Sequence, residues 1–150
     1  MAALLVACGN ADGDGSPGGT EAGDSFPMTI NGAFGRTRID RKPERIAAVG
    51  FLRDGDDALA LGVTPVAMTA NDLFPESFAP WTLEALGSAG TTVLNAPEGL
   101  LPFERIAAAQ PDLILATDDR TLGDHHDRLA GIAPTLAYTI GGSRTVAAAG

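Results

Sequence analysis

A strand–helix–strand pattern at residues 43–67 constrains the fold more than any other feature of the chain. Residues 46–49 form a short apolar run without polar alternation, which is typical of a strand buried on both faces of a parallel sheet. An Asp-rich start, an Ala-Leu stretch and Gly62 then predict a short helix that is N-capped by aspartate and ends at glycine. Pro65 prevents this helix from continuing into residues 66–68, which we expect to form the next strand. This strand–helix–strand unit predicts a parallel sheet with right-handed crossovers.

The same alternation continues along the chain. An Asn-Gly-Ala-Phe-Gly turn predicts a hairpin within residues 26–39, before the first buried strand. Further helices are expected at residues 80–86, 103–109 and 122–130, and further strands at residues 91–94, 113–116 and 135–138. We therefore predict an α/β fold, a single three-layer α/β/α lobe with an N-terminal hairpin and a mostly parallel sheet of roughly five strands. The last ten or so residues show no pattern that assigns them to an element.

The charge balance of the chain excludes one broad class of function. The formal net charge is −9, and Lys42 is the only lysine. A nucleic-acid-binding protein needs a basic face, so we expect no nucleic-acid partner. No apolar run approaches the roughly 20 residues that a transmembrane helix requires.

The N-terminal part differs in composition from the rest. Residues 1–8, MAALLVAC, resemble the end of a bacterial lipobox, in which Cys8 would take a diacylglyceryl group. The basic segment and the long apolar run of a complete signal are missing, so we interpret these residues as a truncated signal remnant; the alternative is a disordered terminus with an incidental thiol. Residues 9–24 hold no large apolar side chain and are expected to be a flexible linker. The lobe then spans residues 25–140, and residues 141–150 are an unassigned tail.

Several short segments occur in an order and spacing that point to a known family. They are Phe26-Pro27-Met28-Thr29-Ile30, Pro43-Glu44-Arg45-Ile46, residues 57–66 (DALALGVTPV), Glu104-Arg105-Ile106 followed by Gln110-Pro111-Asp112-Leu113-Ile114, and Leu129 followed by Ile132-Ala133-Pro134-Thr135. Together they resemble the N-terminal lobe of the iron-siderophore and cobalamin substrate-binding proteins of ABC importers. The resemblance covers about three quarters of the chain, from residue 26 to residue 138.

The resemblance implies a solute-binding lipoprotein that delivers a ferric siderophore to ABC permease subunits and catalyses no reaction. Cobalamin and haem are alternative ligands within the same family. The protein would lie outside the cytoplasm, anchored by lipid to the bacterial cell membrane. The family has two lobes joined by a long helix, and this chain ends where that helix would form, so we expect a single lobe with the second lobe absent, as a fragment or a truncated product. Such a lobe would carry half of a binding site, and we expect it to self-associate, with its last strand as one surface for pairing.

A ferric siderophore is a bulky, often anionic chelate that already fills the coordination sphere of its iron. Its receptor therefore needs aromatic or apolar walls and arginines rather than metal ligands. The candidates at the predicted strand ends are Phe51, Leu52, Arg53, Asn71, Asn95, Arg120 and Tyr138. Arg53 is the strongest because the adjacent helix N-terminus also favours an anion, although a solvated pair with Asp54 or Asp56 is an equal alternative. Arg120 beside Asp118 is expected to be a surface ion pair.

Two further motifs have functional interpretations. The resemblance places Glu104 where the family docks a glutamate against a permease arginine; the alternative is a carboxylate that stabilises the first turn of its helix. The sequence Asp124-His125-His126 matches the metal-binding triplet of DHH phosphoesterases. Adjacent residues of a helix point about 100° apart rather than at one ion, so solvated histidines are the stronger interpretation. We therefore expect no enzyme activity, no metal site and no bound cofactor.

Overall fold

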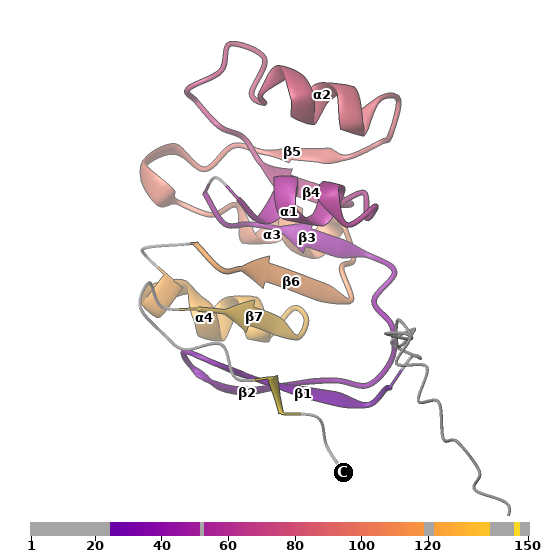
Figure 1. Ribbon diagram of the computed structural model, residues 1–150. Helices are drawn as coiled ribbons and strands as arrows, with labels where there is room; N and C mark the ends of the chain where they lie inside the picture. The colour runs from indigo at the N-terminus through magenta and orange to yellow at the C-terminus, as the bar shows by residue number, and fades with distance from the viewer. Residues whose placement is uncertain (1–24, 52, 119–121, 139–145, 148–150) are drawn as a thin grey trace, which may run out of the picture.

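A parallel sheet with the strand order β5-β4-β3-β6-β7 forms the centre of the structure (Figure 1). The computed structural model describes residues 25–51, 53–118, 122–138 and 146–147. The strands of this sheet are β3 (Ile46–Ala48), β4 (Ala67–Thr69), β5 (Thr92–Leu94), β6 (Leu113–Ala116) and β7 (Thr135–Ala137). The connections are α1 (Asp54–Ala60), α2 (Pro80–Leu86), the 3-10 turn η1 (Pro97–Gly99), α3 (Phe103–Ala108) and α4 (Leu122–Ala130).

Helices cover both faces of this sheet, as the sequence predicts. Ala47 and Val49 point to one face, where they pack against Phe103 and Ile106 of α3 and Leu129 of α4. Figure 1 shows α3 and α4 behind the sheet and α1 in front of it. The apolar runs of the strands follow from this arrangement, because both faces of each strand are covered.

The opposite face carries α1 and α2. Ala48 and Met68 form a buried cluster with Phe78, and Leu83 of α2 packs against it. Gly55 brings α1 so close to β4 that an added Cβ would meet the thioether of Met68. The three-layer α/β/α fold and its five-stranded sheet are therefore confirmed.

The N-terminal hairpin forms a second, antiparallel sheet below β7 (Figure 1). It consists of β1 (Met28–Gly32) and β2 (Gly35–Ile39), and β8 (Val146–Ala147) pairs with the other edge of β1. The sequence did not predict β8, because a two-residue strand has no periodicity of its own and its partner lies at the other end of the chain.

The hairpin also closes the outer edge of β7. The backbone N–H of Ala33 donates to the carbonyl of Ala137 at 3.0 Å, and the Thr37 hydroxyl donates to the carbonyl of Thr135 at 2.7 Å. The expectation that the last strand offers an open edge for pairing with another copy is therefore wrong for β7. The hairpin lies along this edge, so a further strand could pair with β7 only by displacing it.

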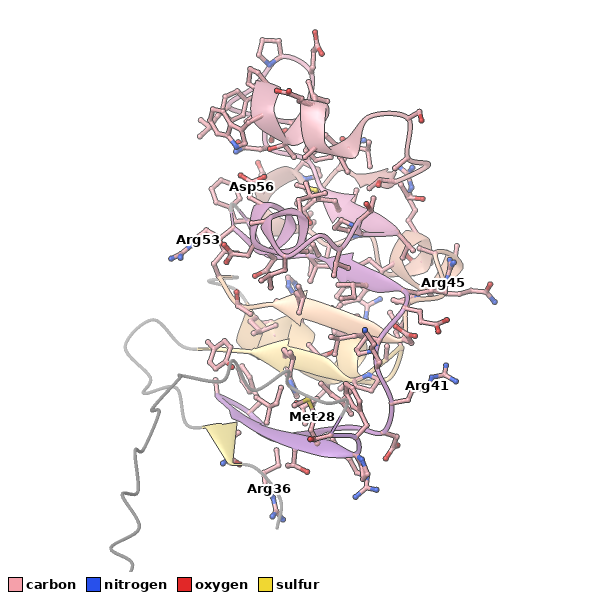
Figure 2. All side chains as sticks on the ribbon, turned by 45° about the vertical axis from the view of Figure 1, so that its right-hand side comes forward. Met28, Arg36, Arg41, Arg45, Arg53 and Asp56 are labelled. Carbon is pink, nitrogen blue, oxygen red and sulfur yellow. The ribbon has the colours of Figure 1, made fainter. Side chains whose placement is uncertain are left out.

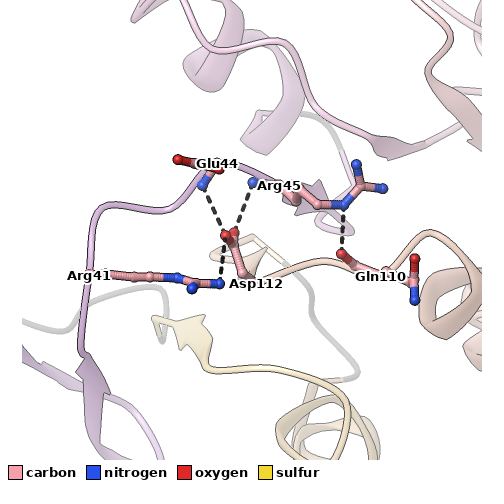
Figure 3. A network of polar contacts seen from close by, with 5 residues as sticks. All are labelled: Arg41, Glu44, Arg45, Gln110 and Asp112. Atoms are coloured by element: carbon pink, nitrogen blue, oxygen red, sulfur yellow. Dashed lines mark hydrogen bonds and ion pairs between the residues drawn. The ribbon is translucent and has the colours of Figure 1, made fainter.

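Two of the recognised segments meet at the amino end of the sheet (Figure 3). The Asp112 carboxylate accepts the backbone N–H groups of Glu44 at 3.0 Å and Arg45 at 2.9 Å, and the Arg41 guanidinium lies 4.0 Å away. The Arg45 side chain in turn donates to the carbonyl of Gln110 at 2.8 Å. The segments at residues 43–46 and 110–114 therefore have a structural role, which is to fix β3 beside β6.

We expect Asp112→Ala to lower the free energy of unfolding by about 2 kcal/mol, because two backbone donors lose a charged acceptor. Urea denaturation measures the change. Glu84→Ala removes the same charge from an exposed position of α2 and should change stability by less than about 0.5 kcal/mol. An Asp112→Ala variant as stable as Glu84→Ala would contradict a role in joining the strands.

Candidate ligand-binding site

The sheet has a topological switch point between β3 and β6. From β3 the chain passes through α1 to β4 on one side, whereas from β6 it passes through α4 to β7 on the other. The loops that follow the two strands therefore diverge, and ligands of open α/β sheets bind in the crevice beyond such strand ends. These loops begin with Gly50 and Thr117.

Asp54 joins the two loops. Its Oδ2 accepts the backbone N–H of Gly50 at 3.0 Å and that of Thr117 at 2.9 Å, and its Oδ1 accepts the Thr117 hydroxyl. The side chain is 1% exposed. Asp118, the next residue, accepts the backbone N–H of Arg53 at 3.2 Å. The expectation that an aspartate caps α1 is thus wrong: Arg53 occupies the N-cap position and no side chain caps the helix. Asp54, in the first turn, binds the neighbouring loops instead.

Burial raises the pKa of Asp54 above its ordinary value of 3.8. The nearby Asp118 carboxylate raises the pKa further, while the hydrogen bonds from Thr117 and Gly50 oppose both effects. A buried carboxyl that accepts several hydrogen bonds holds the two loops in one geometry. It thereby fixes the loops at the carboxyl ends of β3 and β6.

A cavity of about 280 Å³ opens beyond the carboxyl ends of β3 and β4. We call it the aromatic cavity. Its apolar lining consists of Phe51, Met68, Leu73, Phe74, Phe78, Ala79 and Trp81, together with Gly50 and Gly55, and its polar lining consists of Asp56, Thr69, Asn71 and Thr82. Phe51, Leu73 and Trp81 are 56%, 74% and 62% exposed, so large apolar surfaces face solvent at this site. Exposed apolar surface gathered in one concave place marks a binding site.

Asp56 of α1 fixes the wall that α2 supplies. Its Oδ2 accepts the indole N–H of Trp81 at 3.1 Å, and its Oδ1 accepts the Thr82 hydroxyl at 2.7 Å. Phe74 meets the Trp81 ring edge to face, with the ring centres 5.8 Å apart. Trp81 is therefore held at its polar end and against one edge, while its remaining surface is available to a ligand.

Only some of the residues proposed from the sequence line this cavity. Phe51 and Asn71 do, and the Asn71 side chain accepts the backbone N–H of Leu73 at 3.0 Å, which shapes the loop. Arg53 is exposed and extends outward from the start of α1, whereas Asp56 lies between α1 and α2 (Figure 2). Asn95 and Tyr138 follow β5 and β7 and are not among the lining residues. Leu52 and Arg120 lie outside the described residues.

Sequence reasoning missed most of the aromatic lining. Leu73 and Phe74 come from the segment between β4 and α2, and Trp81 comes from the first turn of α2. The signal was an unusual density of aromatic residues, LFPESFAPW, directly after a predicted strand end. Much of this segment is apolar without strand periodicity, and it supplies a core residue, Phe78, as well as large side chains that are exposed at the cavity.

The two histidines of the Asp124-His125-His126 triplet contact different neighbours. The His125 ring meets Phe103 edge to face with centres 5.5 Å apart, and the His126 ring stacks on Phe34 with centres 4.5 Å apart. Among the residues that the structure describes, no group of three or more His, Cys, Asp or Glu side chains is arranged to hold a metal ion. The two histidines thus pack against aromatic rings in different parts of the fold. In the same described ranges, no helix has the length and apolar character needed to cross a membrane.

Glu104 is exposed on α3. Its side chain is 88% accessible and lies 4.0 Å from the Arg128 guanidinium, which covers the ring of Phe103 at 3.6 Å from its centre. This contact is an exposed pair in water and contributes little to stability. The carboxylate is therefore available on the surface.

Comparison with solved structures identifies a group of similar proteins. A periplasmic solute-binding protein from Mycobacterium smegmatis matches with a TM-score of 0.68 and 39% identity, over 83% of this chain and 42% of that one. Staphylococcus aureus SirA, solved with staphyloferrin B, matches with a TM-score of 0.65 and 29% identity, over 74% of this chain and 36% of SirA. Streptococcus pneumoniae PiaA, solved with ferrichrome, matches with a TM-score of 0.65 and 33% identity, over 75% of this chain and 38% of PiaA.

This chain spans less than half the length of each of these three proteins. No protein-family model matches it, and neither does any curated protein.

Proposed function

Because this chain matches one lobe of the siderophore-binding class of periplasmic solute-binding proteins, as its motifs predict, we propose that it supplies one side of a ferric siderophore site in an ABC importer. The observation that carries the proposal is the aromatic cavity beyond the ends of β3 and β4. It lies on the side of the sheet where α/β proteins bind their ligands.

The chemistry of the lining fits a ligand that brings its own metal ligands. A siderophore surrounds its iron, so the receptor contacts the organic shell by shape, stacking and hydrogen bonds. Trp81, Phe74 and Phe51 offer ring faces and edges, and Thr69 and Asn71 offer polar atoms. The role is binding without catalysis.

Trp81 supplies a direct test, because it is the only tryptophan of the chain and it lines the cavity. We expect ferric siderophores to quench its fluorescence saturably. Trp81→Ala should weaken binding about tenfold or more, measured by calorimetry, because an aromatic anchor at the centre of a contact carries much of the affinity.

Leu100→Ala is the matched control, since Leu100 is also a large apolar side chain, 65% exposed, but is not part of the lining. It should leave the affinity unchanged. Saturable binding of cobalamin or haem, but not of ferric chelates, would assign the lobe to another ligand of the same family. Failure of all three classes to bind, or equal affinity in Trp81→Ala, would contradict the proposal.

Three further roles belong to the same proposal. Glu104 would dock against a permease arginine, and its 88% accessible side chain on α3 supports this. Cys8, outside the described residues, would carry the lipid that anchors the protein outside the cytoplasm. The isolated lobe would self-associate through its exposed aromatic surface rather than through β7.

A further inference from the structure

The aromatic cavity is built from an acidic part of the chain. All of its lining residues fall within residues 50–82, and this segment carries five acidic residues against a single arginine. That arginine, Arg53, is exposed, is not a lining residue, and extends outward from the start of α1 (Figure 2). Among the described lining residues the one ionisable side chain is Asp56. A ligand in the cavity therefore faces one carboxylate and no cation among the described lining residues.

The Asp56 carboxylate is held in place at the cavity. Both of its oxygens accept hydrogen bonds from α2, from the Trp81 indole at 3.1 Å and the Thr82 hydroxyl at 2.7 Å. These donors are neutral, so they orient the carboxylate without cancelling its charge. Among the described residues, no ion pair neutralises it. A fixed, partly buried charge beside an apolar wall discriminates between ligands by their own charge.

We propose that this site selects ferric chelates of neutral or positive charge over anionic ones, and that Asp56 is the residue that sets this preference. The inference rests on the proposed function and names the class of ligand for the same cavity. Trihydroxamate chelates of iron(III) fit, because three singly charged hydroxamates balance the metal charge. Triscatecholate chelates carry three net negative charges and are disfavoured by the same surface.

A ligand series with one iron centre and different terminal charges tests the proposal. Ferrioxamine B carries a terminal ammonium; its N-acetyl form is neutral, and its N-succinyl form carries a carboxylate on the same iron centre. We expect the affinity of the chain to fall in that order, by roughly two- to fivefold per step, the size of an exposed charge pair. The steps should shrink at 1 M salt, where such pairs are screened.

The variant Asp56→Asn should flatten the series, because it removes the charge while an amide oxygen remains to accept a hydrogen bond. Asp57→Asn is the matched control. It removes the same charge from the next residue of α1, which is exposed and outside the lining, and should leave the steps as they are. Trp81 fluorescence of the unliganded variants reports whether the indole keeps its environment.

The outcomes separate the two proposals. If none of the three chelates binds, the proposed function fails. If all bind with equal affinity, or the succinyl form binds best, the function stands and the charge preference is refuted. If Asp56→Asn weakens all three equally, Asp56 acts only by positioning Trp81. If Asp57→Asn flattens the series as much as Asp56→Asn, the preference comes from net charge and not from Asp56.

Discussion

Gly50→Ala is expected to lower the free energy of unfolding by about 3 kcal/mol, the sum of overpacking and a weakened hydrogen bond. A Cβ at this position would overlap Oδ1 of Asp118 and Oδ2 of Asp54. Gly50 is not among the glycines with a positive φ, so space rather than backbone conformation requires glycine here. Relieving the overlap would move the Asp54 carboxylate away from the N–H groups that it accepts.

Gly123→Ala is the control for this experiment. Gly123 lies in α4, with no atom within 4 Å of an added Cβ and no positive φ. Alanine there should stabilise the protein by roughly 0.5–1 kcal/mol, because glycine is a poor helix former. Chemical denaturation of both variants compares the same substitution in two environments. Equal effects of the two would show that the contact at Gly50 is not tight.

Asp54→Ala is expected to cost about 3 kcal/mol as well. The substitution leaves the N–H groups of Gly50 and Thr117 and the Thr117 hydroxyl without their acceptor in a buried place, and each unsatisfied group is costly. Asp57→Ala removes a carboxylate from the same first turn at an exposed position and should cost less than about 1 kcal/mol. Equal losses in the two variants would mean that Asp54 acts only as a charge near the helix start.

The pH dependence of stability tests the raised pKa of Asp54 independently. The pKa of Asp54 is raised in the folded state, chiefly by burial. At pH values between 3.8 and this raised pKa, the folded protein therefore holds more protons at Asp54 than the unfolded chain does. The contribution of Asp54 to the unfolding free energy therefore falls as the pH rises from 3.8 to the raised pKa, and it is constant above that point. Asp54→Asn cannot titrate and lacks this slope.

The measurement is the stability of the wild type minus that of Asp54→Asn at each pH. The subtraction removes the titration of the other carboxylates, and we expect the difference to fall with rising pH and then to level off. A difference that rises with pH would mean that hydrogen bonds from Thr117 and Gly50 outweigh burial. Asp54 would then be a carboxylate with a lowered pKa.

The buried Asp54 helps to fix the geometry of the site. Asp54 and Asp118 hold the loops after β3 and β6 through bonds from Gly50, Arg53 and Thr117. Phe51, which lines the cavity, lies in the chain between Gly50 and Arg53, whose backbone N–H groups are both held by these carboxylates. A preorganised wall loses less conformational entropy when a ligand binds.

The sequence by itself determined the order and the type of the elements. Local chemistry carries that information: Gly62 takes a φ of 77° after α1, Pro80 starts α2, and apolar runs without alternation become strands covered on both faces. The motifs that carry the family resemblance also determine the fold rather than the site. Asp112 and Arg45, for example, join neighbouring strands at the end of the sheet away from the cavity. The carboxyl-end location of the site and the candidates Phe51 and Asn71 also followed from where the predicted strands end.

Only the tertiary structure decided which side chains meet. Asp54 reads as a helix cap in the sequence, yet it binds Thr117, 63 residues away. Asp56 reads as a first-turn charge, yet it holds Trp81, 25 residues away. Helix caps and turns depend on residues a few positions apart, whereas these pairs depend on β3 lying beside both β4 and β6. Strand order is set by the burial of the whole sheet, so the pairs that shape the site exist only once the sheet has formed.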